Sequence, residues 1–285
     1  MTKELTIGIP TANRPVSLQA CLDSIQKYVD FPAKIIIVDS SDPELRFKSE
    51  LLQSDVEVIY SEQMLSPAHA RKVIADSCDS EFLLYIDDDM MVSEDSVQSL
   101  MAYLKINVKV DIVGGAVDEY GAWREIGFNF QLGKLSDSQV VVKQPIRKDW
   151  LDQHGFEAFR VDLVTQPPFL MRTEIFKKVN FDKNYLWASE IFDFFFQCYF
   201  AGVVSVVVPS AVFYHYPTSY DQTTHKHGKR HHNQQGRAYF AKKWNTRIHA
   251  LKRNQLLFLL MDEWQYRRAK KKRVRKKIKL DAVQY

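Results

Sequence analysis

The fold of this chain is indicated by one stretch of sequence, Phe82-Leu83-Leu84-Tyr85-Ile86-Asp87-Asp88-Asp89-Met90-Met91. Its apolar first half is typical of a buried strand, and three consecutive carboxylates follow directly. Such a concentration of negative charge is favourable only where a cation or a set of hydrogen-bond donors neutralises it. The triplet therefore predicts a Mg²⁺ or Mn²⁺ site in which phosphate groups of a ligand complete the coordination shell. The alternative is a solvated acidic turn before a helix that begins near Ser93.

On both sides of this stretch, strand patterns alternate with helix patterns. Strands are predicted at residues 5–10, 34–39, 56–60, 82–86 and 111–117, and helices at residues 17–28 and 67–76. The alternation predicts an α/β fold whose ligand sites lie beyond the carboxyl ends of parallel strands. Thr11, Asn13, Asp39 and the aspartate triplet all fall at those ends.

The second half of the chain begins less regularly. No regular element is predicted from residue 118 to about 144, a stretch that contains Tyr120, Trp123, Phe128 and Phe130. These aromatic residues are interpreted as ordinary core, with a ligand platform as the alternative. Regular patterns return as helices at 173–179 and 189–201, a strand at 203–208 and a helix from about residue 234.

The charge of the chain is distributed unevenly. Its net charge is +4, yet the segment from residue 267 to 279 carries ten Lys or Arg residues and no acid, so the remainder sums to −6. A basic tail that follows the apolar residues 256–261 can contact an anionic membrane surface, bind nucleic acid or remain solvated. Membrane contact is the favoured interpretation, and no nucleic acid is expected because the body is acidic.

The composition, with 46% hydrophobic and 26% charged residues, is that of a soluble globular protein. No apolar run is long enough to cross a membrane, and the N-terminal residues lack the pattern of a signal peptide. A cytoplasmic location is therefore expected, with peripheral contact at the inner face of the membrane. Three widely spaced cysteines argue against a disulfide framework or a thiolate metal site.

Several motifs, taken in order, resemble those of GT-A glycosyltransferases, in particular glycosyltransferase family 2. They lie at residues 7–14, 36–42, 66–72, 87–89, 187–194 and 212–217. The resemblance implies a GT-A fold, which is a Rossmann-like mixed sheet flanked by helices. It implies a catalytic domain at residues 1–217, divided into a nucleotide-binding half (1–115) and an acceptor half (116–217). Residues 218–285 would then form a His/Lys-rich loop, a helix and the basic tail.

The resemblance also implies which residues bind the nucleotide. They are Pro10, Thr11, Asn13, Arg14, Asp39, Arg71, Asp87 and Asp88. Asp89 is expected to ligate Mn²⁺ or Mg²⁺, with Asp87 as a further ligand and His215 completing the shell from the opposite side. An imidazole ligand suits Mn²⁺ better than Mg²⁺. Independently of the resemblance, Arg71 near a helix N-terminus offers a donor fork to an anion.

Two acids, Glu190 and Asp193, lie three residues apart and so share one face of the predicted helix. Family members carry a second acid directly after the first, and one carboxylate deprotonates the acceptor hydroxyl. Here Ile191 takes that place, so the base is either Glu190 or Asp193. Glu190 is favoured, with Asp193 orienting the acceptor; acids that merely stabilise a helix N-terminus are the structural alternative.

The histidines at 225, 227, 231 and 232 are interleaved with basic residues, which opposes a zinc site. A basic loop that closes over a diphosphate is the preferred interpretation. Its candidate phosphate contacts are Lys229, Arg230 and Arg237.

Together these features and the resemblance predict a metal-dependent glycosyltransferase of surface polysaccharide synthesis, and the resemblance implies inversion at the anomeric carbon. A nucleoside diphosphate sugar, expected to be UDP-linked, is the predicted donor, and a glycan or lipid-linked saccharide is the acceptor. A sugar-1-phosphate nucleotidyltransferase is the enzymatic alternative, but residues 10–14 lack the glycines of its phosphate loop. A non-enzymatic binder of nucleic acid or anionic surfaces, acting through the tail, is the third hypothesis.

Overall fold

A computed structural model describes residues 3–48, 55–135, 138–186, 188–216 and 229–250. Met1–Ile248 form one compact unit, and His249–Tyr285 form a second. The helix α7 (Lys229–Trp244) therefore belongs to the same unit as the strands. The functional division expected at residue 217 stays a prediction.

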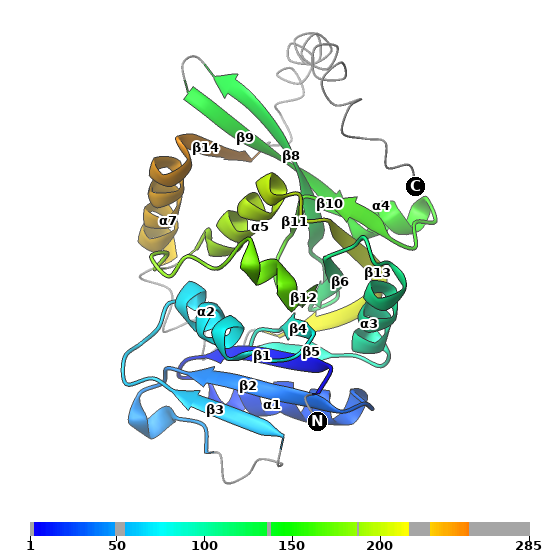
Figure 1. The fold of residues 1–285 in the computed structure, drawn as a ribbon, viewed down its shortest axis with the longest axis vertical. Helices are drawn as coiled ribbons and strands as arrows, with labels where there is room; N and C mark the ends of the chain where they lie inside the picture. The colour runs from blue at the N-terminus through cyan, green and yellow to red at the C-terminus, as the bar shows by residue number, and fades with distance from the viewer. Residues whose placement is uncertain (1–2, 49–54, 136–137, 187, 217–228, 251–285) are drawn as a thin grey trace. The chain divides into compact units, whose positions relative to one another are not determined.

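The described chain is organised around a mixed sheet in the order β10-β13-β6-β12-β4-β1-β2-β3. Strands β1 to β4 run parallel, whereas β12 is antiparallel to both β4 and β6. This arrangement confirms the predicted α/β mixed sheet (Figure 1). The strands are β1 (Leu5–Thr11), β2 (Ala33–Asp39), β3 (Val56–Tyr60), β4 (Phe82–Tyr85), β5 (Met90–Val92), β6 (Ile112–Glu119), β7 (Ala122–Trp123), β10 (Phe159–Val161), β12 (Phe169–Arg172) and β13 (Ser205–His215).

Helices cover both faces of this sheet, which is why its central strands carry apolar residues on both faces. In β4, Phe82 and Leu84 join one core while Leu83 and Tyr85 join the other, as alternation along a strand requires. Helices α1 (Pro15–Tyr28) and α3 (Ser96–Ile106) pack into the first core, and α2 (Pro67–Ser77) and α5 (Glu190–Ala201) pack into the second. The short elements are η1 (Pro43–Leu45), α4 (Lys148–Gln153) and η3 (Thr173–Lys177).

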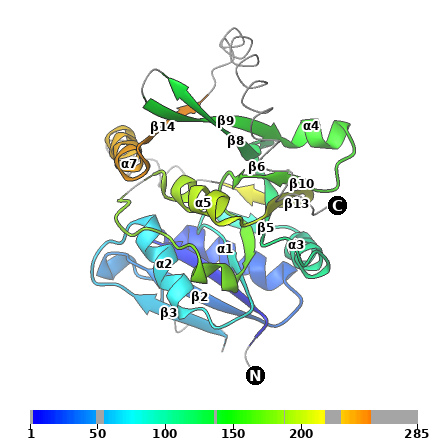
Figure 2. The ribbon, with the colours of Figure 1, turned by 45° about the horizontal axis from the view of Figure 1, so that its top comes forward.

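A second sheet has the order β11-β8-β9-β14, and α5 lies between it and the central sheet (Figures 1 and 2). Here the structure corrects the expectation of an irregular stretch, because residues 125–147 form a long hairpin. The missed signal is an alternation in which Ile126, Phe128, Phe130 and Leu132 are separated by polar residues or glycine. The strands are β8 (Glu125–Leu135), β9 (Ser138–Arg147), β11 (Leu163–Val164) and β14 (Thr246–Ala250).

Candidate active site

The aspartate triplet forms the turn between β4 and β5, beside the end of β1. The backbone N–H of Ile86 donates to the Gly8 carbonyl at 3.2 Å, and that of Met90 donates to the Asp87 carbonyl at 3.1 Å. From β1, the Thr11 hydroxyl donates to Asp88 Oδ2 at 2.6 Å. The carboxylates therefore lie at the carboxyl ends of the parallel strands, where ligands bind in open α/β sheets.

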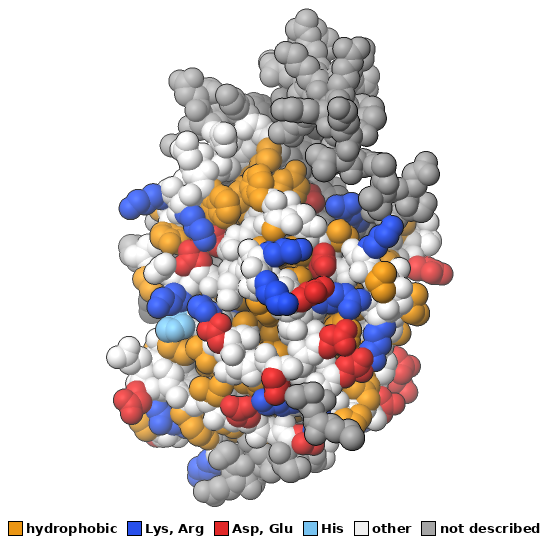
Figure 3. Space-filling model, in the orientation of Figure 1, with side chains coloured by type: hydrophobic (Ala, Val, Ile, Leu, Met, Phe, Trp, Pro, Cys, Tyr) orange, Lys and Arg blue, Asp and Glu red, His pale blue; other side chains and the backbone are white. Residues whose placement is uncertain are grey.

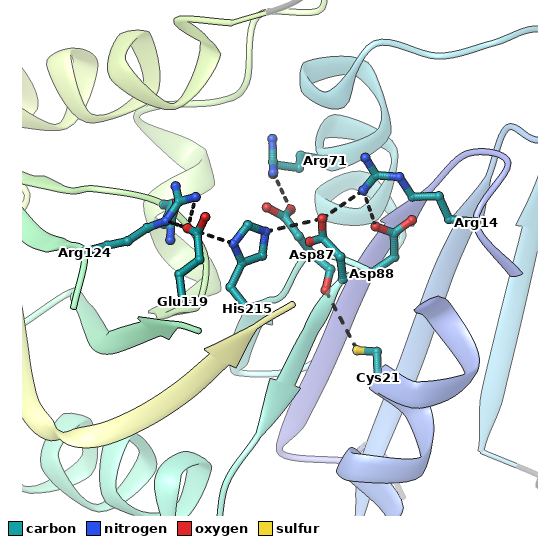
Figure 4. A network of polar contacts seen from close by, with 10 residues as sticks. Arg14, Cys21, Arg71, Asp87, Asp88, Glu119, Arg124 and His215 are labelled. Atoms are coloured by element: carbon teal, nitrogen blue, oxygen red, sulfur yellow. Dashed lines mark hydrogen bonds and ion pairs between the residues drawn. The ribbon is translucent and has the colours of Figure 1, made fainter. Parts of the chain in front are cut away.

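Two arginines neutralise the triplet from its two sides (Figure 4). Arg71, which is 3% exposed, donates to Asp87 at 2.6 Å and to Glu190 at 3.1 Å. One terminal nitrogen of Arg14 donates to both Asp88 and Asp89, each at 3.0 Å. Burial raises the pKa of Asp88 to about 7, against the opposing charge of Arg14.

His215 reaches Asp89 from β13, and its role as a metal ligand stays a prediction. Because β13 pairs antiparallel with β5, His215 lies across from Met90, the neighbour of Asp89. His215 Nε2 is 3.3 Å from Asp89 Oδ2, and the backbone N–H of Tyr216 donates to the Asp89 carbonyl at 3.2 Å. Burial works against the charge of Asp89, but the hydrogen bond and charge of His215 outweigh it and lower the pKa of Asp89.

Two further charged residues complete this side of the site, and the sequence did not point to them. Glu119, at the end of β6, lies 3.3 Å from His215 Nδ1 and pairs with Arg124. Arg124 in turn donates to Gln166 Oε1 at 3.0 Å. The signal available was the pair of acids, Asp118 and Glu119, that follows the strand predicted at residues 111–117, but the partner of Glu119, His215, is 96 residues away.

The donor chemistry of Asp89 and His215 fits a divalent cation. No three His, Cys, Asp or Glu side chains gather as a metal-holding group among the described residues. A carboxylate and an imidazole nonetheless face each other from different elements, and Glu119 fixes the other imidazole nitrogen. Cations that bind few protein ligands complete their shell with substrate phosphates, so two such ligands suffice for a site of this kind.

Glu190 begins α5 and reaches the triplet through Arg71. The two residues before it, Ala188 and Ser189, have φ of 59° and 67°, in the left-handed region. Residues with side chains rarely adopt that conformation, and they persist where the surrounding structure requires it. The strained entry to α5 places the Glu190 carboxylate against a buried guanidinium, beside the predicted nucleotide site.

Substituting glycine for either of these two residues with positive φ is expected to relieve the strain and stabilise the protein. Ala188→Gly and Ser189→Gly should each raise the free energy of unfolding by about 0.5–1 kcal/mol, since glycine adopts positive φ without steric cost. The matched control is Ala102→Gly on the exposed face of α3, which should lower it by about 1 kcal/mol. Urea unfolding measures all three; destabilisation by both entry variants would contradict the strain argument.

Asp193 does not join the cluster of charged residues around the triplet. It is fully buried and accepts from Tyr185, Trp244, Gln197 and Lys243 at 2.7–3.0 Å. These bonds tie α5 to α7, and Lys243 also pairs with Asp182 at 2.8 Å. The contacts of Asp193 are those of an anchor between helices, and they leave Glu190 as the acid of the pair that lies beside the triplet.

The opening loop and Asp39 are held in place by one another. The backbone N–H of Asn13 donates to Ser41 Oγ at 2.7 Å, and the Asn13 side chain exchanges two hydrogen bonds with Asp42. Asp39 is fully buried, and its two oxygens accept from the backbone N–H groups of Ser41 and Phe47. Asp39 thus shapes the loop after β2; its predicted contact with a base, like the nucleotide contact of Pro10 in β1, stays a prediction.

The predicted phosphate contacts beyond residue 217 are placed only in part. Lys229 and Arg230 begin α7, but their side chains lie outside the described residues, as do His225 and His227. Arg237 is exposed. The pKa of Lys143 on β9 is lowered, first by the burial of Lys143 and second by the charge of Arg237. Within the described residues, no hydrogen bond or ion pair joins Arg237 to the aspartates.

Sequence comparison agrees with this geometry. The family model described as "Glycosyl transferase family 2" matches residues 6–179, which is more than half of the chain. The chain belongs to glycosyl transferase family 2. An "uncharacterized glycosyltransferase" of Haemophilus influenzae is 25% identical over 109 residues, which are 38% of this chain and 37% of the relative.

Several solved structures have the same fold as this family 2 chain. One is that of GalNAc-T7 with UDP, GalNAc and Mn²⁺, with a TM-score of 0.61 and 18% identity over 76% of this chain and 44% of the other. Another is Staphylococcus aureus TarS 1–349 in complex with UDP-GlcNAc, with a TM-score of 0.55 and 16% identity over 76% and 59%. The chain thus spans less than two thirds of these relatives, and the likeness confirms the predicted GT-A fold.

Proposed function

We propose that this family 2 protein transfers a sugar from a nucleoside diphosphate sugar to a hydroxyl group of a glycan or lipid-linked saccharide. A UDP-linked donor is supported by the UDP ligands in the two similar structures. The observation that carries the proposal is the pairing of Asp89 with His215 at the carboxyl ends of the strands, flanked by Arg14 and Arg71. Carboxylate, imidazole and guanidinium groups together suit a metal-bound diphosphate.

Mn²⁺ or Mg²⁺ would be held by Asp89 and His215, with Asp87 as the further candidate ligand. When bound, the ion supplies positive charge that stabilises the departing diphosphate. The Arg14 guanidinium lies at Asp88 and Asp89, and the planar fork of a guanidinium matches the geometry of phosphate oxygens. Thr11 holds Asp88 in place through its hydroxyl.

Glu190 is the candidate base that takes the proton from the acceptor hydroxyl. Arg71 fixes one of its oxygens at 3.1 Å and holds the helix entry against Asp87. With Ile191 in the place of the family's second acid and Asp193 bonded by four donors, Glu190 is the acid of this motif that lies beside the triplet. Direct displacement with inversion at the anomeric carbon is part of the proposal and follows from the family resemblance.

Glu119 is expected to raise metal affinity, because a carboxylate on one imidazole nitrogen fixes the tautomer and orientation of the other. Glu119→Gln should weaken Mn²⁺ binding in the presence of UDP about 10- to 100-fold. Isothermal titration of Mn²⁺ into the UDP-saturated protein measures this. Glu125→Gln, an exposed acid six residues further on, is the control; unchanged Mn²⁺ affinity in Glu119→Gln would contradict the role.

A panel of UDP-, GDP-, CMP- and dTDP-sugars tests the function directly. Binding and turnover are measured with Mn²⁺ and then with EDTA. Metal-dependent binding of one nucleotide sugar is the expected result and identifies the donor. Failure of every nucleotide sugar to bind under both conditions would refute the proposal.

Membrane contact through the basic tail, and a place in surface polysaccharide synthesis, remain part of the proposal. The tail lies outside the described residues. No helix among the described residues is both long and apolar enough to span a bilayer. On the face shown in Figure 3, basic side chains are interspersed with acidic ones, so this face lacks the continuous basic surface that nucleic acid binding uses.

A further inference from the structure

The hairpin between β6 and β7 has an unusual residue at its tip. Glu119 pairs with Ala122, so the loop consists of Tyr120 and Gly121 alone. Their φ angles are 54° and 83°, which is the sign pattern of a type I′ turn, in which Asn-Gly is strongly preferred. A bulky residue with positive φ is a genuine outlier. Tyr120 is moreover 63% exposed, so burial in the core does not offset this strain.

Tyr120 belongs to a group of aromatic rings beside the candidate active site. Its ring centroid lies 5.4 Å from that of Tyr216, which stacks on Tyr214 at 5.9 Å with an interplanar angle of 5°. Trp123, on the same hairpin, is 43% exposed. Phe128 and Phe130, by contrast, pack with the core, so the aromatic group of the sequence divides into core residues and exposed ones.

The position of these rings is set by the active-site network itself. Tyr120 directly follows Glu119 and Tyr216 directly follows His215, and the side chains of Glu119 and His215 are 3.3 Å apart. The pair of rings, Tyr120 and Tyr216, is called the aromatic ledge here. It lies on the β6 and β13 side of His215, whereas the predicted nucleotide residues lie on the β1 and β4 side.

Charged groups border the rings on the same network. Arg124 pairs with Glu119 and also donates to the side-chain oxygen of Gln166. The side chains of Arg124 and Glu119 are 37% and 25% exposed, so hydroxyl groups of a ligand can reach both of them.

We propose that the aromatic ledge is a subsite for the acceptor saccharide, an inference that rests on the proposed function. A pyranose presents an apolar face of C–H groups, which matches the exposed ring of Tyr120 beside that of Tyr216. Its rim of hydroxyls suits the partly exposed Glu119 and Arg124 pair, whereas a lipid chain would cover this pair without forming a hydrogen bond. The subsite also accounts for the strained backbone at Tyr120. An aromatic ring at the hairpin tip can pack against a sugar, whereas the Asn that this turn favours cannot.

The test is Tyr120→Asn, because it improves the turn and removes the ring. Its melting temperature should rise by roughly 2 °C, since Asn-Gly suits a type I′ turn. Its affinity for saccharide should fall about 10-fold, as the loss of one aromatic contact of this kind implies. Affinity is measured by saturation-transfer NMR with methyl β-glycosides of glucose, galactose and N-acetylglucosamine, in the presence of UDP and Mn²⁺.

Two matched variants and one measurement keep the outcomes distinct. Tyr120→Phe should bind glycosides as the unchanged protein does, and Phe200→Ala, at the far end of α5 and 58% exposed, should not alter their binding. UDP binding should be unchanged in all variants. The proposed subsite, but not the proposed function, would be refuted if Tyr120→Asn bound glycosides as tightly as the unchanged protein. The same conclusion would follow if the unchanged protein bound UDP but no glycoside. A chain that binds no nucleotide would overturn the proposed function, and the ledge with it.

Discussion

Asp89→Ala is expected to abolish metal-dependent sugar transfer, with a loss on the order of 10³-fold in kcat/KM. A bound cation contributes several kcal/mol of charge stabilisation to a transition state, and each 1.36 kcal/mol corresponds to a factor of ten. Asp89 faces His215 at 3.3 Å, so its removal takes away one of the two groups that meet there. UDP binding should lose its dependence on Mn²⁺ at the same time.

The fold should survive this substitution well enough for the comparison to be made. Arg14 keeps its contact with Asp88, and His215 keeps Glu119. Glu94→Ala, which removes an exposed acid five residues further along the chain, is the control and should retain nearly full activity. Turnover with Mn²⁺ and titration of UDP measure the effect. An Asp89→Ala protein that transfers sugar within tenfold of the unchanged chain would contradict the assignment.

Arg71→Met is expected to lower the free energy of unfolding by about 3–5 kcal/mol, which is the usual cost of removing one partner from a buried ion pair. Arg71 is 3% exposed and bonds both Asp87 and Glu190. Methionine would fill much of the space but leave both carboxylates without their cation. Urea unfolding measures the loss, with circular dichroism as the signal.

Two further variants test whether the loss comes from the orphaned acids. Combining Arg71→Met with Glu190→Gln removes one buried charge and should recover about 1–3 kcal/mol. Lys72→Met changes the next residue along α2, whose exposed pair with Asp76 should be worth about 0.3–0.5 kcal/mol. If Arg71→Met costs no more than Lys72→Met, the buried bridge does not stabilise the fold as argued.

Part of the site could be read from the sequence because the relevant signals are local. The apolar run before the aspartate triplet predicts a strand, and the alternation of elements places Thr11, Asp39 and the triplet at one edge of the sheet. The structure confirms this arrangement, and the family match confirms the resemblance on which the roles rest. Local pattern suffices here because the carboxyl ends of parallel strands meet at the same edge whatever the loops do.

A local pattern does not distinguish two roles that produce the same pattern. Glu190 and Asp193 are both acids on one face of the predicted helix. In the structure, however, Asp193 accepts hydrogen bonds from Lys243 and Trp244 of α7 and from Tyr185. The irregular-looking stretch after residue 118 proved to be the β8–β9 hairpin, although its alternation was present in the sequence. In both cases the residue pattern was visible in the sequence, but the part of the protein against which these side chains pack was not.

The sequence by itself determined the alternation of strands and helices up to residue 117, the acidic turn after β4 and the family, because these depend on residues that are neighbours in the chain. Only the tertiary structure decided which charges meet. The antiparallel register of β13 with β5 brings His215 to Asp89, and the end of β6 brings Glu119 to His215. The chain separations are long, and register across a sheet is set by packing of the whole core rather than by local pattern.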